Sequence, residues 1–310
     1  MTQSIHEDFI PSQKNPNTCW CWVQNDNGEY VWAQSVINNA IAGDTDSIMI
    51  SMKDILPEGF DDIDLAVEIA DAVGELTNES FADFCKHAFN CPEDRKTIMG
   101  AAREVVSDKS LFVSKKRYAM HVVDNEGKRV DKMKIMGLEI KKSDTSAVLK
   151  DMLLGLIHFI LDGYGVDQIN EEIRKMKEAF FKLDAHSISK PINVKTLKKC
   201  NDMYEMTGDM KGFPYQVRAA MFWNLKAGDH DKKIVPGDKV RLLYIKNKES
   251  KYIAFPVDTM TFPQWFTDDI IIDYNTEWEK AYAKIENYLK SVGMDIASRK
   301  EAIRNDLFGF

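Results

Sequence analysis

The chain has 310 residues, which is enough for two or three domains with hydrophobic cores of their own. No apolar run reaches the length of a membrane span, and residues 1–4 do not open a signal-peptide core. The five cysteines lack the paired spacing of a zinc site. We therefore expect an intracellular protein with free thiols and no membrane partner.

The net charge of −8 hides an uneven distribution of charge. Residues 54–94 hold twelve acidic residues and one basic residue, whereas residues 109–142 hold ten basic and four acidic residues. Because local charge matters more for nucleic-acid binding than the sum, the second segment predicts a basic working face. The alternative for both segments is that their charges only solvate the surface.

Near the N-terminus, residues 19–32 place four aromatic side chains around an Asn-Gly turn at residues 25–28. Such a pattern predicts a β-hairpin. It is either a plain structural hairpin or the remnant of a splicing element that ends near residues 38–39. Ala40 argues against splicing, because that reaction would need Cys, Ser or Thr at this position.

The stretch from Ile41 to Met52 predicts two strands joined by a tight turn, with Asp44 and Asp46 at its tip. Two carboxylates on one hairpin can hold Mg²⁺, which takes one or two carboxylates and completes its shell with water and substrate phosphates. Phosphoryl or nucleotidyl transfer is the corresponding chemistry. Asp-x-Asp on its own is a weak signal, because Asp and Gly are also ordinary turn residues.

Periodicity predicts the next elements. Apolar spacing over residues 63–89 indicates an amphipathic helical pair with an acidic outer face. Residues 96–106 and 109–118 are expected to be strands, the second of which carries the Lys-Lys-Arg triplet of residues 115–117. On an extended strand, these cations would point alternately to opposite sides, toward phosphate and toward a groove edge or a carboxylate. Residues 118–138 then predict a β-hairpin.

The polar segment 139–145 follows, and Ser143 or Asp144 is expected to cap the next helix, whose N-terminus could face a DNA phosphate. The remaining chain predicts a mostly helical region with a small sheet. Helical stripes are expected at Val148, Met152, Leu156, Phe159 and Ile160, at Ile169, Ile173, Met176, Phe180 and Phe181, over residues 193–206 and 214–225, and at Trp278, Tyr282, Ile285 and Leu289; strands are expected at residues 240–245 and 252–255.

Four motifs in a fixed order give the chain a family resemblance. Residues 42–47, Ala-Gly-Asp-Thr-Asp-Ser, resemble the second catalytic carboxylate motif of family B DNA polymerases, which usually begins with Tyr. Residues 115–118 resemble the family's Lys-Lys-Arg-Tyr element. Residues 134–139 resemble the start of the thumb in the T-even bacteriophage branch, and residues 306–310 are similar to the sliding-clamp peptide of that branch.

The resemblance implies an α+β fold, in which an antiparallel palm sheet with flanking helices precedes a mostly helical thumb with a small β element. It assigns residues 40–142 to the C-terminal half of the polymerase palm, residues 143–296 to the thumb and residues 297–310 to a clamp-binding tail. Residues 1–39, with the Trp-rich hairpin, are left without a counterpart.

The resemblance also implies a site. Catalytic and metal-binding roles fall on Asp44 and Asp46, with Glu104 as a third metal ligand, and Mg²⁺ is the expected cofactor of a two-metal site. A surface strand residue is the plain alternative for Glu104, and an ion pair within the thumb is the alternative for Arg218. DNA-binding roles fall on Lys115, Lys116, Arg117, Tyr118, Lys142, Ser143 and Arg218, and clamp-binding roles on Leu307, Phe308 and Phe310.

Two-metal nucleotidyl transfer needs carboxylates from two motifs, and the family's first motif and its nucleotide-binding fingers helix are absent from this sequence. Because Met1 begins the chain, we expect the C-terminal subunit of a split polymerase, with a truncated sequence as the alternative. Its expected partners are primer–template DNA, dNTP, a separate N-terminal polymerase fragment and the sliding clamp, in the cytoplasm of an infected bacterial host.

Two functions of other classes remain open. One is a non-catalytic DNA- and clamp-binding derivative of a polymerase. The other is an Asp-x-Asp glycosyltransferase, which would leave residues 115–118 and the C-terminal tail unexplained.

Overall fold

The computed structural model describes residues 10–11, 18–24, 30–36, 40–44, 47–52, 60–95 and 99–294. The chain divides into two compact units, an N-terminal unit of residues 1–102 and a C-terminal unit of residues 103–310. Helices and antiparallel sheets occur in both, which confirms the predicted α+β class. The predicted boundary between palm and thumb at residue 143 stays a prediction.

Strands of the N-terminal unit form two separate antiparallel sheets. The first sheet contains β1 (Ile10–Pro11), β2 (Thr18–Gln24) and β3 (Tyr30–Val36), and the second contains β4 (Ala40–Asp44) and β5 (Ser47–Ile50). Gln24 pairs with Tyr30, which confirms the aromatic hairpin, although its turn lies outside the described residues.

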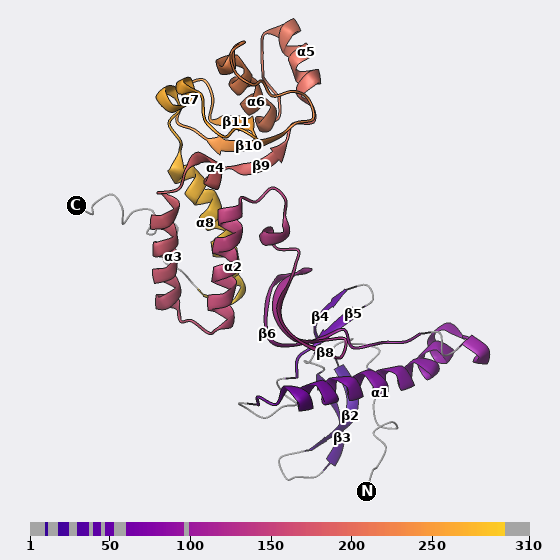
Figure 1. Cartoon of the computed structure of the whole chain (residues 1–310). Coiled ribbons are helices and arrows are strands. Elements are labelled where there is room, and N and C mark those ends of the chain that lie inside the picture. The colour runs from indigo at the N-terminus through magenta and orange to yellow at the C-terminus, as the bar shows by residue number, and fades with distance from the viewer. Residues whose placement is uncertain are drawn as a thin grey trace. The chain divides into compact units, whose positions relative to one another are not determined.

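One long helix, α1 (Ile63–Phe89), replaces the expected helical pair (Figure 1). The prediction was wrong because the polar residues in the middle do not break the helix. The Thr77 hydroxyl donates to the Val73 carbonyl, and the Asn78 side chain bonds both the N–H and the C=O of Ala101 at 2.6 and 2.8 Å. Asn78 thus ties the following segment to the helix instead of ending it.

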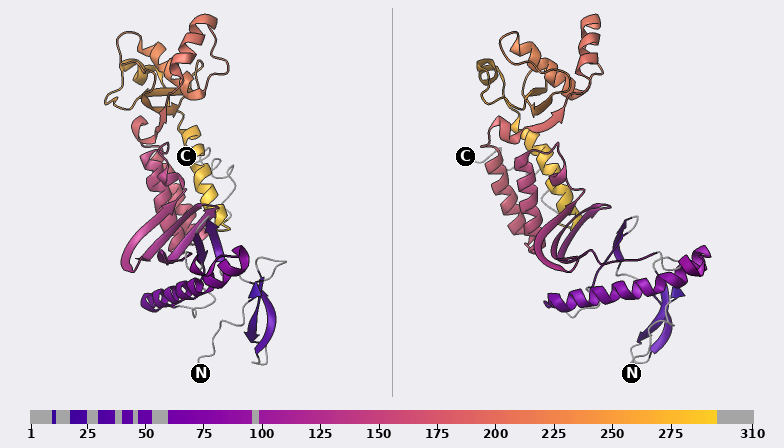
Figure 2. Two further views of the ribbon diagram at one scale, coloured as in Figure 1. Left: turned by 90° about the vertical axis from the view of Figure 1, so that its right-hand side faces the viewer. Right: turned by 45° about the vertical axis from the view of Figure 1, so that its right-hand side comes forward.

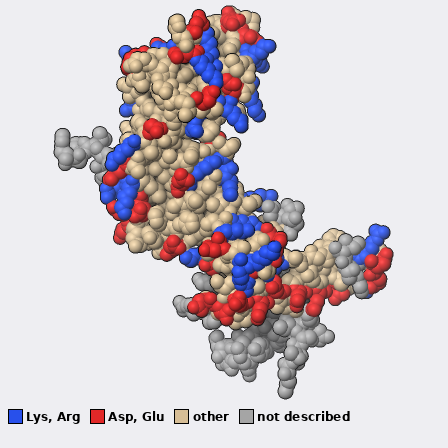
Figure 3. All heavy atoms as spheres, in the orientation of Figure 1, with Lys and Arg blue, Asp and Glu red and all other residues tan. Residues whose placement is uncertain are grey.

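Acidic side chains follow one side of α1, as expected (Figure 3). Asp62 caps the helix by accepting a hydrogen bond from the Leu65 N–H at 3.0 Å. The exposed acids on this side are Asp64, Glu68, Asp71, Glu75 and Glu79. This confirms the predicted acidic outer face.

A three-stranded antiparallel meander opens the C-terminal unit. Its strands are β6 (Val105–Ser114), β7 (Arg117–Asn125) and β8 (Lys128–Met136), in that order. The hairpin between β7 and β8 confirms the prediction; it turns at Glu126 and Gly127, both with positive φ, the geometry that matches strand twist. The strand expected at residues 96–106 was wrong, because residues 99–104 have no regular structure and β6 begins only at Val105.

Two helices, α2 (Ala147–Leu161) and α8 (Tyr274–Ser291), contact β6 of this sheet and each other, and a third, α3 (Val166–Phe180), packs against α2 (Figure 2). The stripe predicted for α2 is confirmed only in part: Leu156 is fully buried, whereas its other members are half-buried against the core, and the remaining fully buried positions are Leu149, Leu153 and Ile157. Almost every side of α2 is apolar, so periodicity could not choose its buried face. The stripes of α3 and α8 are largely confirmed, although Met176 is half-buried and Phe181 is exposed.

The N-cap of α2 is Ser146, whose hydroxyl accepts from the Leu149 N–H at 3.4 Å. The expectation that Ser143 or Asp144 caps this helix was wrong. A short 3₁₀ helix at Glu139–Lys141 and the extended Lys142 precede α2, so the helix begins only at Ala147. Thr145 and Ser146 are buried at this junction.

A small sheet and four helices complete the C-terminal unit. They are α4 (Ala185–Ile188), β9 (Lys190–Asn193), α5 (Leu197–Thr207), α6 (Tyr215–Ala227), β10 (Lys239–Tyr244), β11 (Tyr252–Pro256) and α7 (Gln264–Asp269). The helix expected from residue 193 begins later, because residues 190–193 form an edge strand beside β10. An edge position tolerates Pro191, which has no N–H to donate.

An aromatic core holds this sheet to its helices. The Phe255 ring lies 6.3 Å from the Trp223 ring and 5.0 Å from the Phe262 ring, and Phe262 stacks on Phe266 at 4.1 Å. Asn224 bonds the N–H and C=O of Ile234 and so fixes the loop after α6. Among the described residues, none of the helices is long and apolar enough to cross a membrane.

Candidate metal and nucleic-acid site

The β4–β5 hairpin presents the carboxylate motif. Asp44 ends β4 and pairs with Ser47, which begins β5, so Thr45 and Asp46 join the two strands. The two predicted strands and their antiparallel pairing are therefore confirmed, whereas the predicted turn lies outside the described residues. Thr45, Asp46 and the side chain of Asp44 lie outside the described residues. Two carboxylates one residue apart at a hairpin end are a donor set that fits part of a Mg²⁺ shell.

Glu104, the third expected metal ligand, belongs to the C-terminal unit. Its side chain is 62% exposed, and it accepts a hydrogen bond from the Lys134 ammonium. No group of three or more His, Cys, Asp or Glu side chains in the described part of the chain is arranged to hold a metal. The metal role of Glu104 stays a prediction.

The basic triplet lies at a turn, not on an extended strand as expected. Pairing between β6 and β7 runs to Ser114 and Arg117, which leaves Lys115 and Lys116 as a two-residue turn. Lys116 has a left-handed φ of +61°, which lets the chain reverse within two residues. Both lysines are exposed. The prediction failed because a strand pattern does not show where a hairpin ends.

Arg117 is held by the protein itself. Its Nη2 lies 2.7 Å and 2.6 Å from the two carboxylate oxygens of Glu139, and the Tyr288 hydroxyl donates to Glu139 Oε2 at 3.0 Å. Burial opposes ionisation of Glu139, but its backbone N–H, Tyr288 and the nearby cations together hold the pKa of Glu139 below its usual value. Burial, followed by the Glu139 charge, raises the pKa of Tyr288. Glu139 is therefore a half-buried anion that the Arg117 cation and the Tyr288 hydroxyl both bind.

Of the other expected DNA contacts, three are exposed and Tyr118 is half-buried. Lys142 Nζ lies 3.4 Å from Glu139 Oε1, and Ser143 is exposed beside it. Arg218 is exposed on α6, and within the described residues it has no ion-pair partner, so the alternative of an ion pair in the thumb is not observed. The Tyr118 ring is half-buried and packs against Phe112 at 5.7 Å. Their DNA-binding roles stay predictions.

Ion pairs within the described residues engage cations of the basic segment 109–142. These pairs join Lys109 to Asp162, Arg117 and Lys142 to Glu139, Arg129 to Asp124, and Lys134 to Glu104. Exposed lysines without an acidic partner in the described chain are Lys115, Lys128, Lys132 and Lys141. The sequence count therefore overstated the free positive charge of this face.

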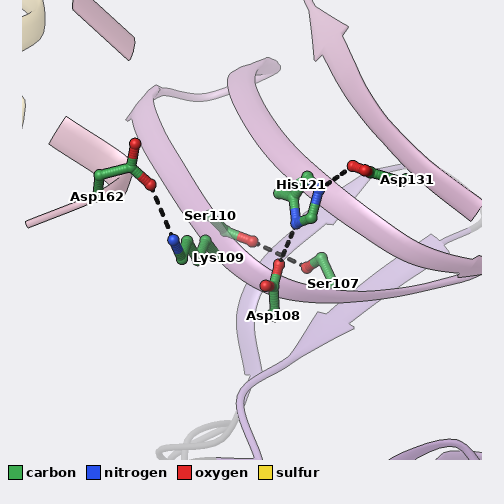
Figure 4. Close-up of polar contacts among 7 residues, drawn as sticks. All are labelled: Ser107, Asp108, Lys109, Ser110, His121, Asp131 and Asp162. Atoms are coloured by element: carbon green, nitrogen blue, oxygen red, sulfur yellow. Dashed lines mark hydrogen bonds and ion pairs between the residues drawn. The ribbon is translucent and has the colours of Figure 1, made fainter. Parts of the chain in front are cut away.

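His121, in the middle of β7, lies between two carboxylates (Figure 4). Its Nδ1 lies 2.7 Å from Asp108 Oδ1, and its Nε2 lies 2.7 Å from Asp131 Oδ1. Both ring nitrogens donate only in the imidazolium form. Hydrogen bonds to Asp131 and then to Asp108 accordingly raise the pKa of His121, against a smaller effect of burial.

We expect the His121 ring to titrate above its ordinary pKa of 6.5 and Asp131→Asn to lower that midpoint, measured by NMR of the ring protons. A raised pKa stabilises the folded protein fully below pH 6.5, and this contribution disappears as the pH rises through the folded pKa. It amounts to less than about 1 kcal/mol, because Asp131 is 94% exposed. Asp167→Asn, on α3, is the control and should leave the midpoint unchanged; an unchanged midpoint in Asp131→Asn would contradict the assignment.

Sequence reasoning missed the partners that organise this region. Glu139 and Tyr288 are 149 residues apart, so no local pattern could pair them. Asp124, within the hairpin predicted over residues 118–138, is fully buried and accepts hydrogen bonds from Arg103, Arg129 and the Gly127 N–H. The only signal for Glu139 was its place in the motif of residues 134–139. The clamp-binding prediction for Leu307, Phe308 and Phe310 lies outside the described residues.

Comparisons with known proteins agree with the resemblance. A sequence model of the family described as DNA polymerase family B matches residues 12–292, which includes part of the segment 1–39 that had no assigned counterpart. The chain is 26% identical over 295 residues to a DNA-directed DNA polymerase of Enterobacteria phage T4, and 27% identical over 296 residues to a DNA-directed DNA polymerase of Escherichia phage RB69. Each comparison covers 86% of this chain and 32% of the relative, so the chain spans about a third of the length of these curated relatives.

Proposed function

Since the chain belongs to DNA polymerase family B, we propose that it is the C-terminal palm and thumb part of a phage replicative DNA-directed DNA polymerase. The observation that carries the proposal is the β4–β5 register, which joins Asp44 to Ser47 through Thr45 and Asp46 inside the segment matched by the family. Both named relatives are phage proteins, and we place this chain in the cytoplasm of an infected bacterium.

In this proposal Asp44 and Asp46 hold Mg²⁺ at the hairpin tip. Bound Mg²⁺ supplies Lewis-acid activation of the primer hydroxyl and charge stabilisation at the departing pyrophosphate of the dNTP. In this proposal the carboxylates fix where this chemistry occurs, because Asp44 ends β4 and Asp46 belongs to the two residues that link β4 to β5. A role for Glu104 near this site is part of the proposal.

The primer–template duplex is held by cations and amides of the C-terminal unit. Lys115 and Lys116 are exposed at the turn between β6 and β7, where two positive charges can meet backbone phosphates without reading sequence. Tyr118, Lys142, Ser143 and Arg218 are the further proposed contacts. Nonspecific contacts of this kind suit an enzyme that must copy any template.

The family's first carboxylate motif and its fingers helix are absent from these 310 residues, so synthesis requires polypeptide that carries them. We propose that a separate N-terminal polymerase fragment supplies both.

The test is primer extension with Mg²⁺ and four dNTPs by this chain alone, by an N-terminal family B fragment from the same genome alone, and by their mixture. Synthesis only in the mixture supports the proposal. DNA binding without synthesis in any reaction supports the non-catalytic alternative.

The tail at residues 307–310 is the proposed tether to the sliding clamp. Two aromatic side chains in one short motif gain most when a partner buries them, and a tether raises the local concentration of polymerase on DNA. Removing Leu307 to Phe310 should leave synthesis without clamp unchanged and abolish the stimulation by clamp, measured as product length on a primed template. Equal stimulation of the truncated and full chains would refute the tether. The Asp-x-Asp glycosyltransferase alternative is set aside, because the chain belongs to family B.

A further inference from the structure

The Lys115–Lys116 turn is pressed against the backbone of the segment that follows β8. Gly137 has a φ of +64°, and a Cβ at this position would lie 2.2 Å from the Lys116 carbonyl oxygen and 3.2 Å from its carbonyl carbon. No side chain larger than hydrogen fits there without moving the turn. The turn itself is strained, because Lys116 has a left-handed φ that costs an L-residue about 1 kcal/mol.

The residues next to Gly137 anchor this contact in the core. Leu138 is fully buried, and Glu139 is 12% exposed with its carboxylate on Arg117. Arg117 directly follows the turn, so the ion pair fixes the position at which β7 begins. Tyr288 of α8 is fully buried, and its hydroxyl donates a hydrogen bond to the same carboxylate.

A strained backbone held by a partly buried charge pair indicates a conformation that the surrounding structure maintains. A turn that is already ordered loses less entropy when its cations bind a ligand, so its contacts are tighter. We propose that Gly137, Glu139 and Tyr288 are positioning residues that hold the Lys115–Lys116 turn in its DNA-binding geometry, and that Arg117 serves this support instead of touching DNA. The inference rests on the proposed contact between this turn and primer–template DNA.

The first test compares two glycines of the same sheet. Gly137→Ala and Gly127→Ala both place alanine at a positive φ, which costs each variant about 1 kcal/mol, but a Cβ at Gly127 meets nothing within 4 Å. The readout is fluorescence anisotropy of a labelled primer–template duplex with the full 310-residue chain over a range of salt concentrations. We expect Gly137→Ala to raise Kd about tenfold and to lower the salt slope by one to two, as the loss of one or two phosphate contacts would. Gly127→Ala should stay within twofold of wild type.

The second test uses the sign of an electrostatic effect. Glu139→Gln and Glu171→Gln each remove one carboxylate from a Glu–Arg pair and raise the net charge by one; Glu171 pairs with Arg174 on α3. If charge alone mattered, Glu139→Gln would bind DNA more tightly, because it frees Arg117 on a basic face. A positioning role predicts the opposite, about threefold weaker binding for Glu139→Gln, with Glu171→Gln at or slightly below the wild-type Kd. Tyr288→Phe, which leaves the charge unchanged, should weaken binding in the same direction as Glu139→Gln.

The outcomes separate the inference from the function on which it rests. If the wild-type chain does not bind the duplex, or if Lys115→Gln and Lys116→Gln bind as wild type does, the proposed DNA contact is refuted and the inference with it. If the two lysine variants are weak but Gly137→Ala or Glu139→Gln binds as tightly as wild type, the positioning role alone is overturned. Melting temperatures identify a variant that does not fold. If Gly137→Ala does not fold, the comparison of Glu139→Gln with Glu171→Gln decides whether the positioning role holds.

Discussion

Replacing Asp46 with alanine should abolish metal-dependent DNA synthesis by the reconstituted polymerase while leaving duplex binding within about twofold of wild type. Two-metal catalysis contributes several kcal/mol of transition-state charge stabilisation, so losing a carboxylate that would hold these ions should lower the rate of primer extension by a factor of about a thousand or more. In the proposed function DNA binding depends on the cations of the C-terminal unit, so it should survive this substitution. The measurements are single-turnover primer extension and anisotropy with the same duplex.

The matched control for Asp46 is its neighbour Thr45. Both residues join β4 to β5, so Thr45→Ala disturbs the same turn without removing a carboxylate. Thr45→Ala should retain synthesis within a few-fold of wild type. Activity of Asp46→Ala comparable to that of Thr45→Ala would remove Asp46 from the site, and equal loss in both variants would indicate a damaged turn instead of a missing metal ligand.

Changing Glu277 to glutamine should stabilise the protein above pH 7. Glu277 of α8 is only 9% exposed, and its Oε1 accepts a hydrogen bond from the Tyr244 N–H at 2.8 Å. Burial raises the pKa of Glu277 to about 7, although the Tyr244 N–H and the Lys190 charge act in the opposite direction. Because a glutamine oxygen can accept the same hydrogen bond, the substitution removes the ionisable group and keeps the contact.

The direction of the effect follows from the two pKa values. Below pH 4.5, Glu277 is protonated in the folded and the unfolded chain, and its favourable contribution to the free energy of unfolding is fully present. Between pH 4.5 and about 7, the unfolded chain ionises first, so stability falls by up to about 3 kcal/mol and then stays level. Glu277→Gln should therefore match wild type near pH 4.5 and exceed it at pH 8 by about 1 to 3 kcal/mol in urea unfolding.

Glu286 provides the control on the same helix. It forms a surface ion pair with Lys290 at 2.7 Å, so Glu286→Gln should cost less than about 1 kcal/mol at pH 8 and should not stabilise the protein. Comparing each variant with wild type at the same pH cancels the titration of all other carboxylates. A stability difference between Glu277→Gln and wild type that does not change with pH would contradict a buried, protonated Glu277.

Local patterns were sufficient for the elements whose stabilising contacts are close in sequence. The β4–β5 hairpin and the β7–β8 hairpin follow from alternation and turn residues, and α8 follows from its apolar stripe. For the same reason the family resemblance could be carried by short motifs, and the family match over residues 12–292 confirms it. These features depend on neighbours within one hairpin or a few helical turns, which a sequence displays directly.

Contacts between distant segments decided the rest. Whether Arg117 meets DNA or Glu139 depends on a carboxylate 22 residues away and on a tyrosine 149 residues beyond that carboxylate. Which face of α2 is buried depends on α3, α8 and β6 packing around a helix that is apolar on nearly every side. How much of the basic segment stays free depends on acids such as Asp162 and Glu104, brought to it by folding. Burial and charge pairing are properties of neighbours in space, so only the tertiary structure could supply them.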